Sequence, residues 1–359
     1  MNLESPQQAE ELHNAATATA ILIVNYRRAA DTLECLNSLT QVNDPPFQVF
    51  LADNGSRLEE VATLAGYAAQ YPDWLHFIAY SDNTGFTGAH NRLLADIVQD
   101  GRYPYILLLN NDTVVEPDFL ARMLARLDSE RRIGMVAARV MRYADHTQVD
   151  NLGITFYRCG LASNRKSVDD PLLGPSGNCA LYATEMLRQV YQITGEYFDE
   201  HFFCYAEDTD LAWRAVLLGY RAAYAENARV YHKGSVASGG PNSDFVLYHG
   251  IRNSLFVLIK NVPARLLGRN LFWMLVLHAA ILLRYTVKGK LRIVYRLYRD
   301  FLRDLPVMCR KRRLLQQQRR VQLGEIAGMV SRQFYERDYV RDALRDLFET
   351  SMTTTQQRP

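Results

Sequence analysis

Residues 106–112 read Ile-Leu-Leu-Leu-Asn-Asn-Asp, an apolar run that ends directly in three polar residues. The run is too short for a helix, and short apolar runs bounded by turn-forming residues are typical of buried strands. Similar runs recur through the first 140 residues, separated by stretches with helical spacing. The predicted strands are residues 20–24, 47–52, 75–79, 105–109 and 133–137, and the predicted helices are residues 29–40, 58–70, 87–100 and 117–127. This alternation predicts βαβ units and a mostly parallel sheet.

Polar clusters follow the predicted strands, where a parallel sheet binds its ligands. They are Asn25-Tyr26, Asp53-Asn54-Gly55-Ser56, Asn83-Thr84-Gly85-Phe86 and Asn110-Asn111-Asp112. Any one of them could be ordinary turn chemistry, since Asn, Asp, Gly and Ser dominate turns for local reasons. All four together favour a shared site at one edge of the sheet.

Three common active-site motifs are missing. The sequence has no G-x-x-x-x-G-K-[ST], no G-x-G-x-x-G and no G-x-S-x-G. This argues against a P-loop NTPase, an ordinary dinucleotide dehydrogenase and a serine hydrolase. Carboxylates, amides and one histidine remain, a set that suits a divalent cation with a nucleotide phosphate.

Asp112 and His232 are the candidate metal ligands. A carboxylate after so apolar a strand is costly unless it is paired or metal-bound, although Asp112 could instead cap the helix near Pro117. His232 follows a predicted pair of strands, residues 221–225 and 228–231, and is the best nitrogen ligand. The alternative for a lone histidine is a structural role.

An acidic run surrounds the start of a helix predicted from about residue 207 to Leu218, with Gly219 as its stop. One carboxylate there would complement the helix N-terminus. Several carboxylates crowded near a phosphate-bearing ligand raise one another's pKa, which tunes a general base. The run comprises Asp199, Glu200, Glu207, Asp208 and Asp210.

In this order and spacing, the segments resemble family 2 glycosyltransferases, particularly a bacterial rhamnosyltransferase-like branch. The resemblance extends from about Ala20 to Asn253. It implies an α/β GT-A fold, Rossmann-like, with a mostly parallel central sheet flanked by helices. Beyond the four clusters, it is carried by Thr87-Gly88-Ala89-His90-Asn91, Ser176-Gly177-Asn178, Phe198-Asp199-Glu200, Glu207-Asp208-Thr209-Asp210-Leu211, His232-Lys233-Gly234-Ser235 and Arg252-Asn253.

The resemblance also implies roles for single residues. Asp208 matches the catalytic base, with Glu207 and Asp199 expected on the acceptor side. Asp112 and His232 match ligands of Mg²⁺ or Mn²⁺, together with Asn110, which stands where the strict D-x-D motif has Asp. Lys233 and Arg252 could touch the diphosphate or merely solvate the surface. The expected nucleotide-sugar-binding residues are Asn25, Asp53 as reader of the base, Asn83, Gly85, Phe86, Asn91, Asn110, Asn111, Gly177, Asn178, Lys233 and Arg252.

The activity so implied is an inverting, metal-dependent transfer of a sugar to a hydroxyl of a glycan or lipid-linked acceptor in cell-surface polysaccharide synthesis. L-rhamnose from dTDP-rhamnose is the preferred donor, and a UDP-sugar is the first alternative. A nucleotidyltransferase would need a glycine-rich loop after the first strand, where Asn25-Tyr26-Arg27-Arg28 has no glycine. A non-catalytic binding protein would not need Asp112, Asp208 and His232 intact.

The composition is that of a globular chain: of 359 residues, 48% are hydrophobic and 22% are charged, which excludes a disordered or collagen-like protein. The five scattered cysteines form no C-x-x-C. They argue against a disulfide framework or zinc knuckle and favour a reducing compartment. The first 19 residues lack Lys and Arg, so no secretory signal is expected.

The C-terminal region is basic. Residues 284–320 contain 13 Lys or Arg and two Asp, a balance of +11 in a chain whose total is +2. The apolar run 271–283 has only 13 residues, whereas a bilayer span needs about 20. Arg292, Arg296, Arg299 and Arg303 share one face of a helix whose other side carries Leu291, Val294, Tyr298, Phe301 and Leu305.

This amphipathic pattern predicts a helix lying in a membrane interface, and hence a cytoplasmic enzyme peripheral to the inner membrane. The alternatives are a helical cap packed on the catalytic domain or a contact within a homo-oligomer. No nucleic-acid partner is expected, because no fold signature accompanies the charge. The predicted division is a flexible N-terminus (1–18), a GT-A domain (19–255), a basic helical membrane-associating or oligomerisation region (256–350) and a flexible tail (351–359).

Overall fold

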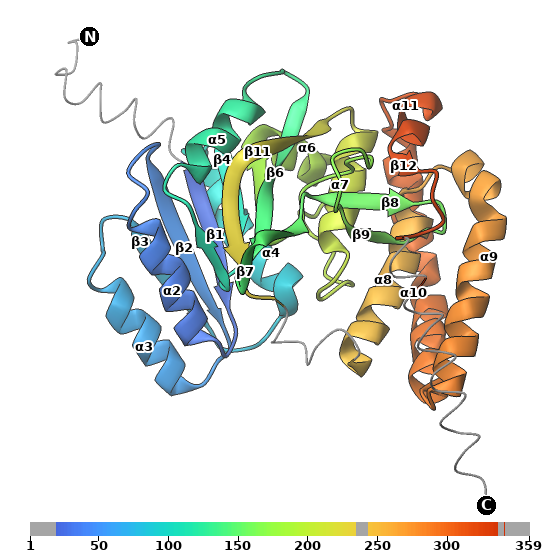
Figure 1. Cartoon of the computed structure of the whole chain (residues 1–359), viewed down its shortest axis with the longest axis horizontal. Helices are drawn as coiled ribbons and strands as arrows, with labels where there is room; N and C mark the ends of the chain where they lie inside the picture. Colours follow the sequence, from blue (N-terminus) through green and yellow to red (C-terminus); the bar gives the residue numbers. More distant parts are fainter. Residues whose placement is uncertain (1–18, 235–242, 337–340, 342–359) are drawn as a thin grey trace, which may run out of the picture.

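The computed structural model describes residues 19–234, 243–336 and 341, so both predicted flexible ends, residues 1–18 and 351–359, lie outside the described residues. Its main feature is a nine-stranded sheet in the order β3-β2-β1-β4-β10-β6-β11-β5, with β7 paired to β6 (Figure 1). The first four strands are β1 (Thr19–Asn25), β2 (Phe47–Asn54), β3 (Leu75–Tyr80) and β4 (Tyr105–Leu109). They are mutually parallel, as the alternation in the sequence predicted.

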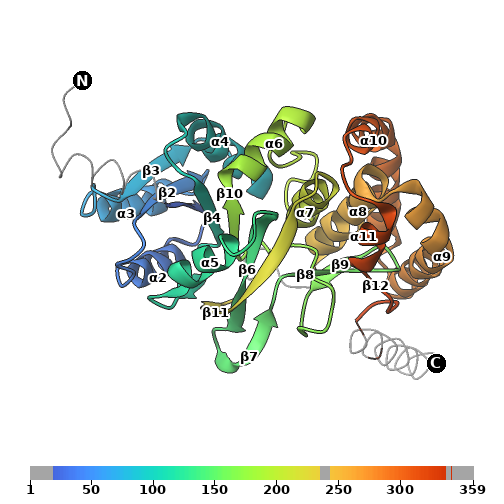
Figure 2. The ribbon, with the colours of Figure 1, turned by 90° about the horizontal axis from the view of Figure 1, so that it is seen from above.

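Helices cover both faces of this half of the sheet, because the side chains of a strand point alternately to either face. Ile21 and Ile23 pack on one face, and Ala20 and Leu22 on the other. Figure 2 shows α2 and α5 on the first face and α4 and α6 on the second. The helices of this half are α2 (Ala29–Leu39), α3 (Leu58–Ala68), α4 (Gly85–Asp100) and α5 (Phe119–Leu127), close to their predicted bounds.

The second half of the sheet adds antiparallel strands to a sheet that is still mostly parallel, as predicted. The strand β10 (Cys179–Ala183) lies between β4 and β6 (Ile133–Arg142) and is antiparallel to both. The strand β11 (Arg221–His232) is one strand, parallel to β6 with an irregularity after Ala225, and not the predicted pair. The remaining strands of this sheet are β5 (Thr113–Val115) and β7 (Asp145–Asn151), both antiparallel to their neighbours.

Two helices and a small sheet complete the central part. The helix α6 (Thr184–Thr194) follows β10, and α7 (Glu207–Leu217) ends two residues before Gly219, close to the predicted stop. Three short strands form the order β12-β8-β9, with bounds Val330–Ser331, Ile154–Tyr157 and Ala162–Asn164. This small sheet joins the end of the described chain to its middle, because β12 pairs with β8.

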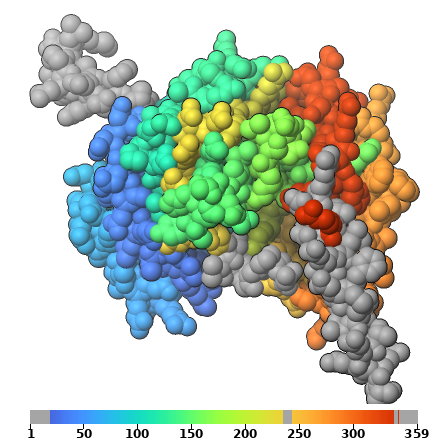
Figure 3. All heavy atoms as spheres, in the orientation of Figure 1, coloured from blue at the N-terminus to red at the C-terminus, as the bar shows by residue number. Residues whose placement is uncertain are grey.

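The C-terminal helices are α8 (Asp244–Asn261), α9 (Ala264–Val287), α10 (Leu291–Gln317) and α11 (Leu323–Gly328). The helix α8 packs against α7 on one side and α10 on the other. The predicted domain boundary after residue 255 therefore falls inside a continuous helix that belongs to both parts. Space-filling atoms of these helices form one side of the molecule (Figure 3).

The helix α9 corrects the expectation that its apolar run is too short to span a bilayer. It has 24 residues, and it is the one helix among the described residues that is long and apolar enough to cross a membrane by length and composition. Only 28% of its most apolar window is buried. Its outward side carries the exposed residues Leu271, Phe272, Leu275, Leu282, Leu283 and Val287.

The helix α10 corrects the expectation that its own apolar side faces a membrane. Val294 is buried, Phe301 packs on Phe256 of α8, and the hydroxyl of Tyr298 contacts His278 of α9 at 2.7 Å. That side therefore serves as the helical cap that was the alternative prediction. A longer exposed apolar stretch lies on α9, although α10 also exposes Leu291, Tyr295, Leu302 and Leu314.

Candidate active site

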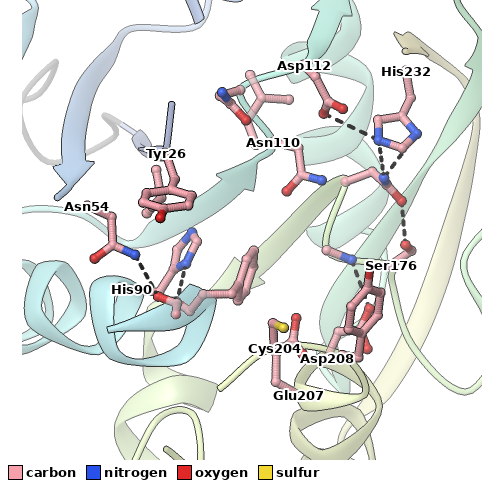
Figure 4. A pocket seen from close by; sticks show the side chains of 18 of the residues that line it. Tyr26, Asn54, His90, Asn110, Asp112, Ser176, Cys204, Glu207, Asp208 and His232 are labelled. Atoms are coloured by element: carbon pink, nitrogen blue, oxygen red, sulfur yellow. Dashed lines mark hydrogen bonds and ion pairs between the residues drawn. The ribbon is translucent and has the colours of Figure 1, made fainter. Parts of the chain in front are cut away.

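A cavity of about 840 Å³ opens where β1, β2 and β4 end at the carboxyl edge of the sheet. All four predicted polar clusters contribute to its wall, through Tyr26, Asn54, Asn83 and residues 110–112. Later segments close it, namely residues 176–178, residues 203–208 and His232. Figure 4 shows Asp112 and His232 on one side of this cavity, with Glu207 and Asp208 across from them.

The Asp112–His232 pair forms because β5 and β11 are neighbours. The register places His232 opposite Thr113, the residue after Asp112. As a result, His232 Nε2 lies 3.3 Å from Asp112 Oδ1. On its other side, His232 Nδ1 lies 2.9 Å from Oδ2 of Asp150, a residue of β7. Burial disfavours the imidazolium, but the two carboxylates prevail and raise the pKa of His232 to about 9.

The Glu207–Asp208 pair stands at the start of α7. Asp208 Oδ2 accepts a hydrogen bond from the Gly177 amide at 3.1 Å, and its Oδ1 accepts one from the Thr209 amide at 2.6 Å. Glu207 is only 7% exposed, and its Oε2 has no hydrogen-bond partner among the described residues. Burial, reinforced by the charge of Asp208, raises the pKa of Glu207 to about 8. Burial also raises the pKa of Asp208, although the two amides oppose the shift.

The loop before α7 is held in an uncommon conformation. Phe203, Tyr205 and Ala206 all have positive φ, between 64° and 69°, which L-residues adopt only when the surroundings enforce it. The enforcing contacts come from Asn253 of α8. Its Nδ2 donates to the carbonyl oxygens of Phe202, Cys204 and Tyr205 at 2.8–2.9 Å, and these bonds fix where Glu207 and Asp208 enter the cavity.

Arg252 is a correction to the predicted diphosphate contacts. Its guanidinium donates to the carbonyl oxygen of His201 at 2.8 Å and to Asn253 Oδ1 at 2.9 Å. The residue is 7% exposed and does not line the cavity. Its position on the buried side of α8 turns it toward the loop backbone, so it supports the loop.

Asp199 is a second correction, because it does not reach the acceptor side of the cavity. Its carboxylate is fully buried and pairs with Lys260 at 2.8 Å and with Lys311 at 2.7 Å. Asp210 shares Lys260 at 3.0 Å and pairs with Arg214 at 2.8 Å. Burial opposes ionisation of both carboxyls, but Lys260 prevails and lowers the pKa of each.

The predicted nucleotide-binding residues divide into two groups. Asn83, Gly85 and Phe86 line the cavity, and Asn83 Oδ1 accepts from Asn54 Nδ2 at 3.0 Å. Gly85 has φ +73°, and a Cβ there would collide with the Phe203 carbonyl oxygen. Asn110, Asn111, Gly177 and Asn178 also line the cavity.

Asn25, Asp53 and Asn91 do not line it. Asn25 Nδ2 donates to Asp53 Oδ2 at 2.7 Å, and both residues are fully buried. Successive strand residues face opposite ways, so it is Asn54 and not Asp53 that reaches the cavity. The side chain of Asn91 is bound to the backbone of Phe198. Its Nδ2 donates to the Phe198 carbonyl and its Oδ1 accepts from the Phe198 N–H, both at 2.8 Å.

Lys233 is a further correction, because it points away from the cavity. Its ammonium pairs with Asp31 at 2.8 Å and with Glu34 at 2.5 Å. Both carboxylates belong to α2. The next residue, Gly234, lines the cavity instead.

Comparison with known proteins identifies the class of enzyme to which the chain belongs. Residues 20–191 match the family described as "Glycosyl transferase family 2". An N-acetylglucosaminyl-diphospho-decaprenol L-rhamnosyltransferase of Mycobacterium tuberculosis is 24% identical over 259 residues, which cover 64% of this chain and 80% of that protein. The chain is a glycosyltransferase with a family 2 domain.

Solved glycosyltransferases share the fold. A mannosyltransferase from Pyrobaculum calidifontis, in complex with GDP-Man and Mn²⁺, has a TM-score of 0.51 and 16% identity over 83% of this chain and 84% of that one. S. aureus TarS 1-349, in complex with UDP-GlcNAc, has a TM-score of 0.54 and 15% identity over 84% of this chain and 91% of that one. At such identities the likeness supports the GT-A fold alone.

The residues of the glycosyltransferase cavity fit a divalent cation that takes few of its ligands from the protein. Among the described residues, no group of three His, Cys, Asp or Glu side chains forms a ready metal site. Mg²⁺ and Mn²⁺ nevertheless often take one or two protein ligands and complete their shell with substrate phosphates and water. Asp112 supplies one donor, and His232 supplies a second when a cation displaces its Nε2 proton. Asp150 can accept the other ring N–H of His232, as outer carboxylates do in metal sites.

Sequence reasoning missed several residues of the glycosyltransferase cavity. Asp150 lies in β7, in an irregular stretch where no strand was predicted, so nothing connected it with His232. Asn54 was quoted in its cluster but given no role. Tyr26, His90 and Ser176 stood inside quoted segments, and their position after a strand, on a helix or in a loop was the only available signal.

Proposed function

We propose that this glycosyltransferase moves a sugar from a nucleotide-sugar donor to an acceptor hydroxyl with inversion at the anomeric carbon. The observation that supports the proposal most is the placement of Asp112 and His232 across one cavity from Asp208 (Figure 4). One side carries candidate ligands for a cation, and the other side carries a carboxylate that can accept a proton. A single displacement needs both groups to face the same reacting centre.

Asp112 and His232, with the amide of Asn110, would hold Mg²⁺ or Mn²⁺. A bound cation supplies charge that offsets the negative charge growing on the departing diphosphate. The backbone contributes as well. The main-chain N–H of Asn110 donates to the main-chain carbonyl of Asn178 at 2.9 Å, and this bond connects the candidate metal ligands to the loop that contains Gly177. These contacts keep the donor corner fixed during the reaction.

Asp208 would act as the general base. The acceptor oxygen attacks the anomeric carbon, its proton passes to an Asp208 carboxylate oxygen, and the bond from carbon to the diphosphate oxygen breaks. A raised pKa strengthens the base, provided that enough of it is ionised at working pH. Glu207, whose pKa of about 8 keeps it protonated at neutral pH, would donate a hydrogen bond on the acceptor side.

The proposed donor is dTDP-L-rhamnose, with UDP-sugars as the alternative, and the proposed acceptor is a glycan or lipid-linked sugar of cell-surface polysaccharide synthesis. The relative from Mycobacterium tuberculosis, named as a rhamnosyltransferase acting on N-acetylglucosaminyl-diphospho-decaprenol, supports the first choice. UDP-GlcNAc bound to TarS supports the alternative.

We also propose that the chain acts at the cytoplasmic face of the inner membrane. The support comes from the exposed apolar side of α9, where Phe272 and Leu275 are more than 60% exposed, and from the basic residues of α10 beside it. An apolar face with a basic margin suits a membrane interface. The GT-A domain, proposed for residues 19–255, would then reach an acceptor carried by that membrane.

Activity measurements test the proposal directly. The full chain is incubated with dTDP-rhamnose, UDP-GlcNAc or GDP-mannose, with Mn²⁺ or with EDTA, and release of the nucleoside diphosphate is followed. We expect release to require the metal and to be fastest with dTDP-rhamnose, and NMR of the product to show the inverted anomer. Release from none of the three donors, or a retained anomer, would contradict the proposal.

A further inference from the structure

A second cavity, of about 780 Å³, lies between the start of α8 and the α9–α10 connection. We call it the basic groove. The groove lies next to the active-site cavity, because Asp244 of α8 lines the groove and the following residue, Phe245, lines the cavity. In Figure 1 the lower end of α8, the α9–α10 connection and the carboxyl edge of the sheet share one end of the molecule. The lining residues of the groove are Asp244, Gly289, Lys290, Arg292, Ile293, Tyr295, Arg296 and Arg299.

The charge of the groove is strongly positive. Lys290, Arg292, Arg296 and Arg299 face one lining carboxylate, Asp244, which pairs with Lys290 at 2.8 Å. Asp300 lies behind them, 2.7 Å from Arg299 and 3.8 Å from Arg296. Among the residues that the structure describes, the groove therefore has two carboxylates for four cations, which leaves about two positive charges. The Arg292 guanidinium has no hydrogen bond or ion pair among the described residues.

Two of the three arginines, Arg296 and Arg299, are held in place by Asp300 and Tyr248. Asp300 is 3% exposed, and its Oδ2 accepts a hydrogen bond from the Tyr248 hydroxyl at 2.7 Å. Arg296 also stacks over the Tyr248 ring, 5.0 Å from its centroid. Guanidinium groups fixed in this way present paired N–H donors, the arrangement that suits phosphate oxygens.

An apolar surface begins at the groove. Tyr295 lines the groove and is 67% exposed, and Leu291 and Val287 beside it are about half exposed. The stripe continues along α9 through Leu283, Leu282 and Leu275. A ligand that fills both features needs a doubly negative head and an apolar chain.

From these observations we infer that the basic groove binds the phosphate or diphosphate group of an amphipathic acceptor, whose hydrocarbon chain lies along the exposed side of α9. The inference rests on the proposed function, because the acceptor's sugar would then extend past Phe245 into the active-site cavity. The phosphate that occupies the groove is that of the acceptor, and not that of a phospholipid of the surrounding membrane.

Binding of farnesyl diphosphate, below its micelle-forming concentration, tests the inference. The full chain is first saturated with dTDP, so that a diphosphate cannot enter the active-site cavity. We expect farnesyl diphosphate to bind more tightly than inorganic pyrophosphate or farnesol. Arg292→Glu should weaken binding roughly tenfold, since charge-assisted hydrogen bonds contribute that much. Arg292→Gln, a milder change, should weaken it less.

Arg310→Glu is the matched control, since Arg310 is an exposed residue of the same helix outside the groove. Equal losses of farnesyl diphosphate affinity in Arg292→Glu and Arg310→Glu would show that only the overall positive charge of the helix attracts the ligand, and would overturn the inference. Pyrophosphate binding as tight as farnesyl diphosphate would also overturn it, by assigning the groove to free phosphate. So would an Arg292→Glu defect confined to phosphatidylglycerol vesicles, or tighter binding of an oligonucleotide.

The proposed function is read separately, by titrating dTDP into the wild-type chain with Mn²⁺ and without farnesyl diphosphate. Failure of dTDP to bind would contradict the proposed donor site. The comparison of Arg292→Glu with Arg310→Glu would still report on the groove, because neither residue lines the active-site cavity.

Discussion

Two sets of carboxylates meet near the start of α7, where Asp210 follows Glu207 by three residues, and they differ in their partners. Asp210, with Asp199 beside it, meets the ammonium of Lys260 and has a lowered pKa. Asp208 accepts hydrogen bonds from two amides and Glu207 lies next to its charge, and both carboxyls have a raised pKa. Burial is common to the two sets, so the nearby cation decides which carboxylates are permanently charged. The first set stabilises the fold, and the second is left available for a substrate.

The largest expected effect tests the second set. Asp208→Asn keeps the size of the side chain but removes the proton acceptor, so we expect turnover to fall by about 10²- to 10⁴-fold. The midpoint of thermal unfolding should change little, because the hydrogen-bond partners of Asp208 in the described part of the chain are neutral groups of Gly177 and Thr209. Asp118→Asn, at an exposed surface ion pair, is the control. A near wild-type turnover in Asp208→Asn would remove Asp208 as the base.

Replacing Lys260 tests the first set. Lys260→Met leaves Asp199 and Asp210 buried without their shared cation, and breaking such a pair costs about 3–5 kcal/mol in the free energy of unfolding. Urea denaturation measures the loss. Lys311→Met removes a more exposed partner of Asp199 and should cost less. Equal losses in the two variants would show that the buried cation has no special role.

The metal dependence of donor binding distinguishes a carboxylate that holds the cation, Asp112, from one that only orients His232, Asp150. Asp112→Ala should abolish the difference between donor titrations with and without Mn²⁺, because the only carboxylate among the three candidate ligands is gone. Asp150→Asn should keep that difference but weaken metal binding by about 10- to 100-fold, as loss of an outer carboxylate does. Calorimetric titration measures both. An Asp112→Ala variant that still needs Mn²⁺ would reject the assignment.

The smallest effect, counted per pH unit, is the pH dependence of the free energy of unfolding. Because Glu207 has a pKa of about 8 in the fold and 4.5 as its ordinary value, the folded chain binds more protons than the unfolded chain between these two pH values. Stability therefore falls as pH rises through this window, by up to about 1.4 kcal/mol per pH unit from this group. Glu207→Gln should remove that slope in urea denaturation. An unchanged slope would show that Glu207 is ionised when buried.

Much of the fold could be predicted because its first half is built from local signals. Residues 106–109 are apolar enough to specify a buried strand, and Asn110 ends it without help from the rest of the chain. The segment around β10 gave no such signal, since Cys-Ala-Leu-Tyr-Ala is short and follows a glycine-rich stretch. Its antiparallel insertion between β4 and β6 depends on pairings made only in the folded sheet.

For the site, the sequence alone determined which residue types stand at the ends of the strands, and it identified Asp112, His232 and Asp208, which the structure brings to one cavity. Only the tertiary structure decided which charged residues are already engaged. Asp199, Lys233 and Arg252 carry the expected charges, but their partners lie far away in sequence. Asp150 joins His232 across 82 residues. Apolar periodicity is a local property that short segments express directly, whereas the partner of a charge depends on how distant segments pack.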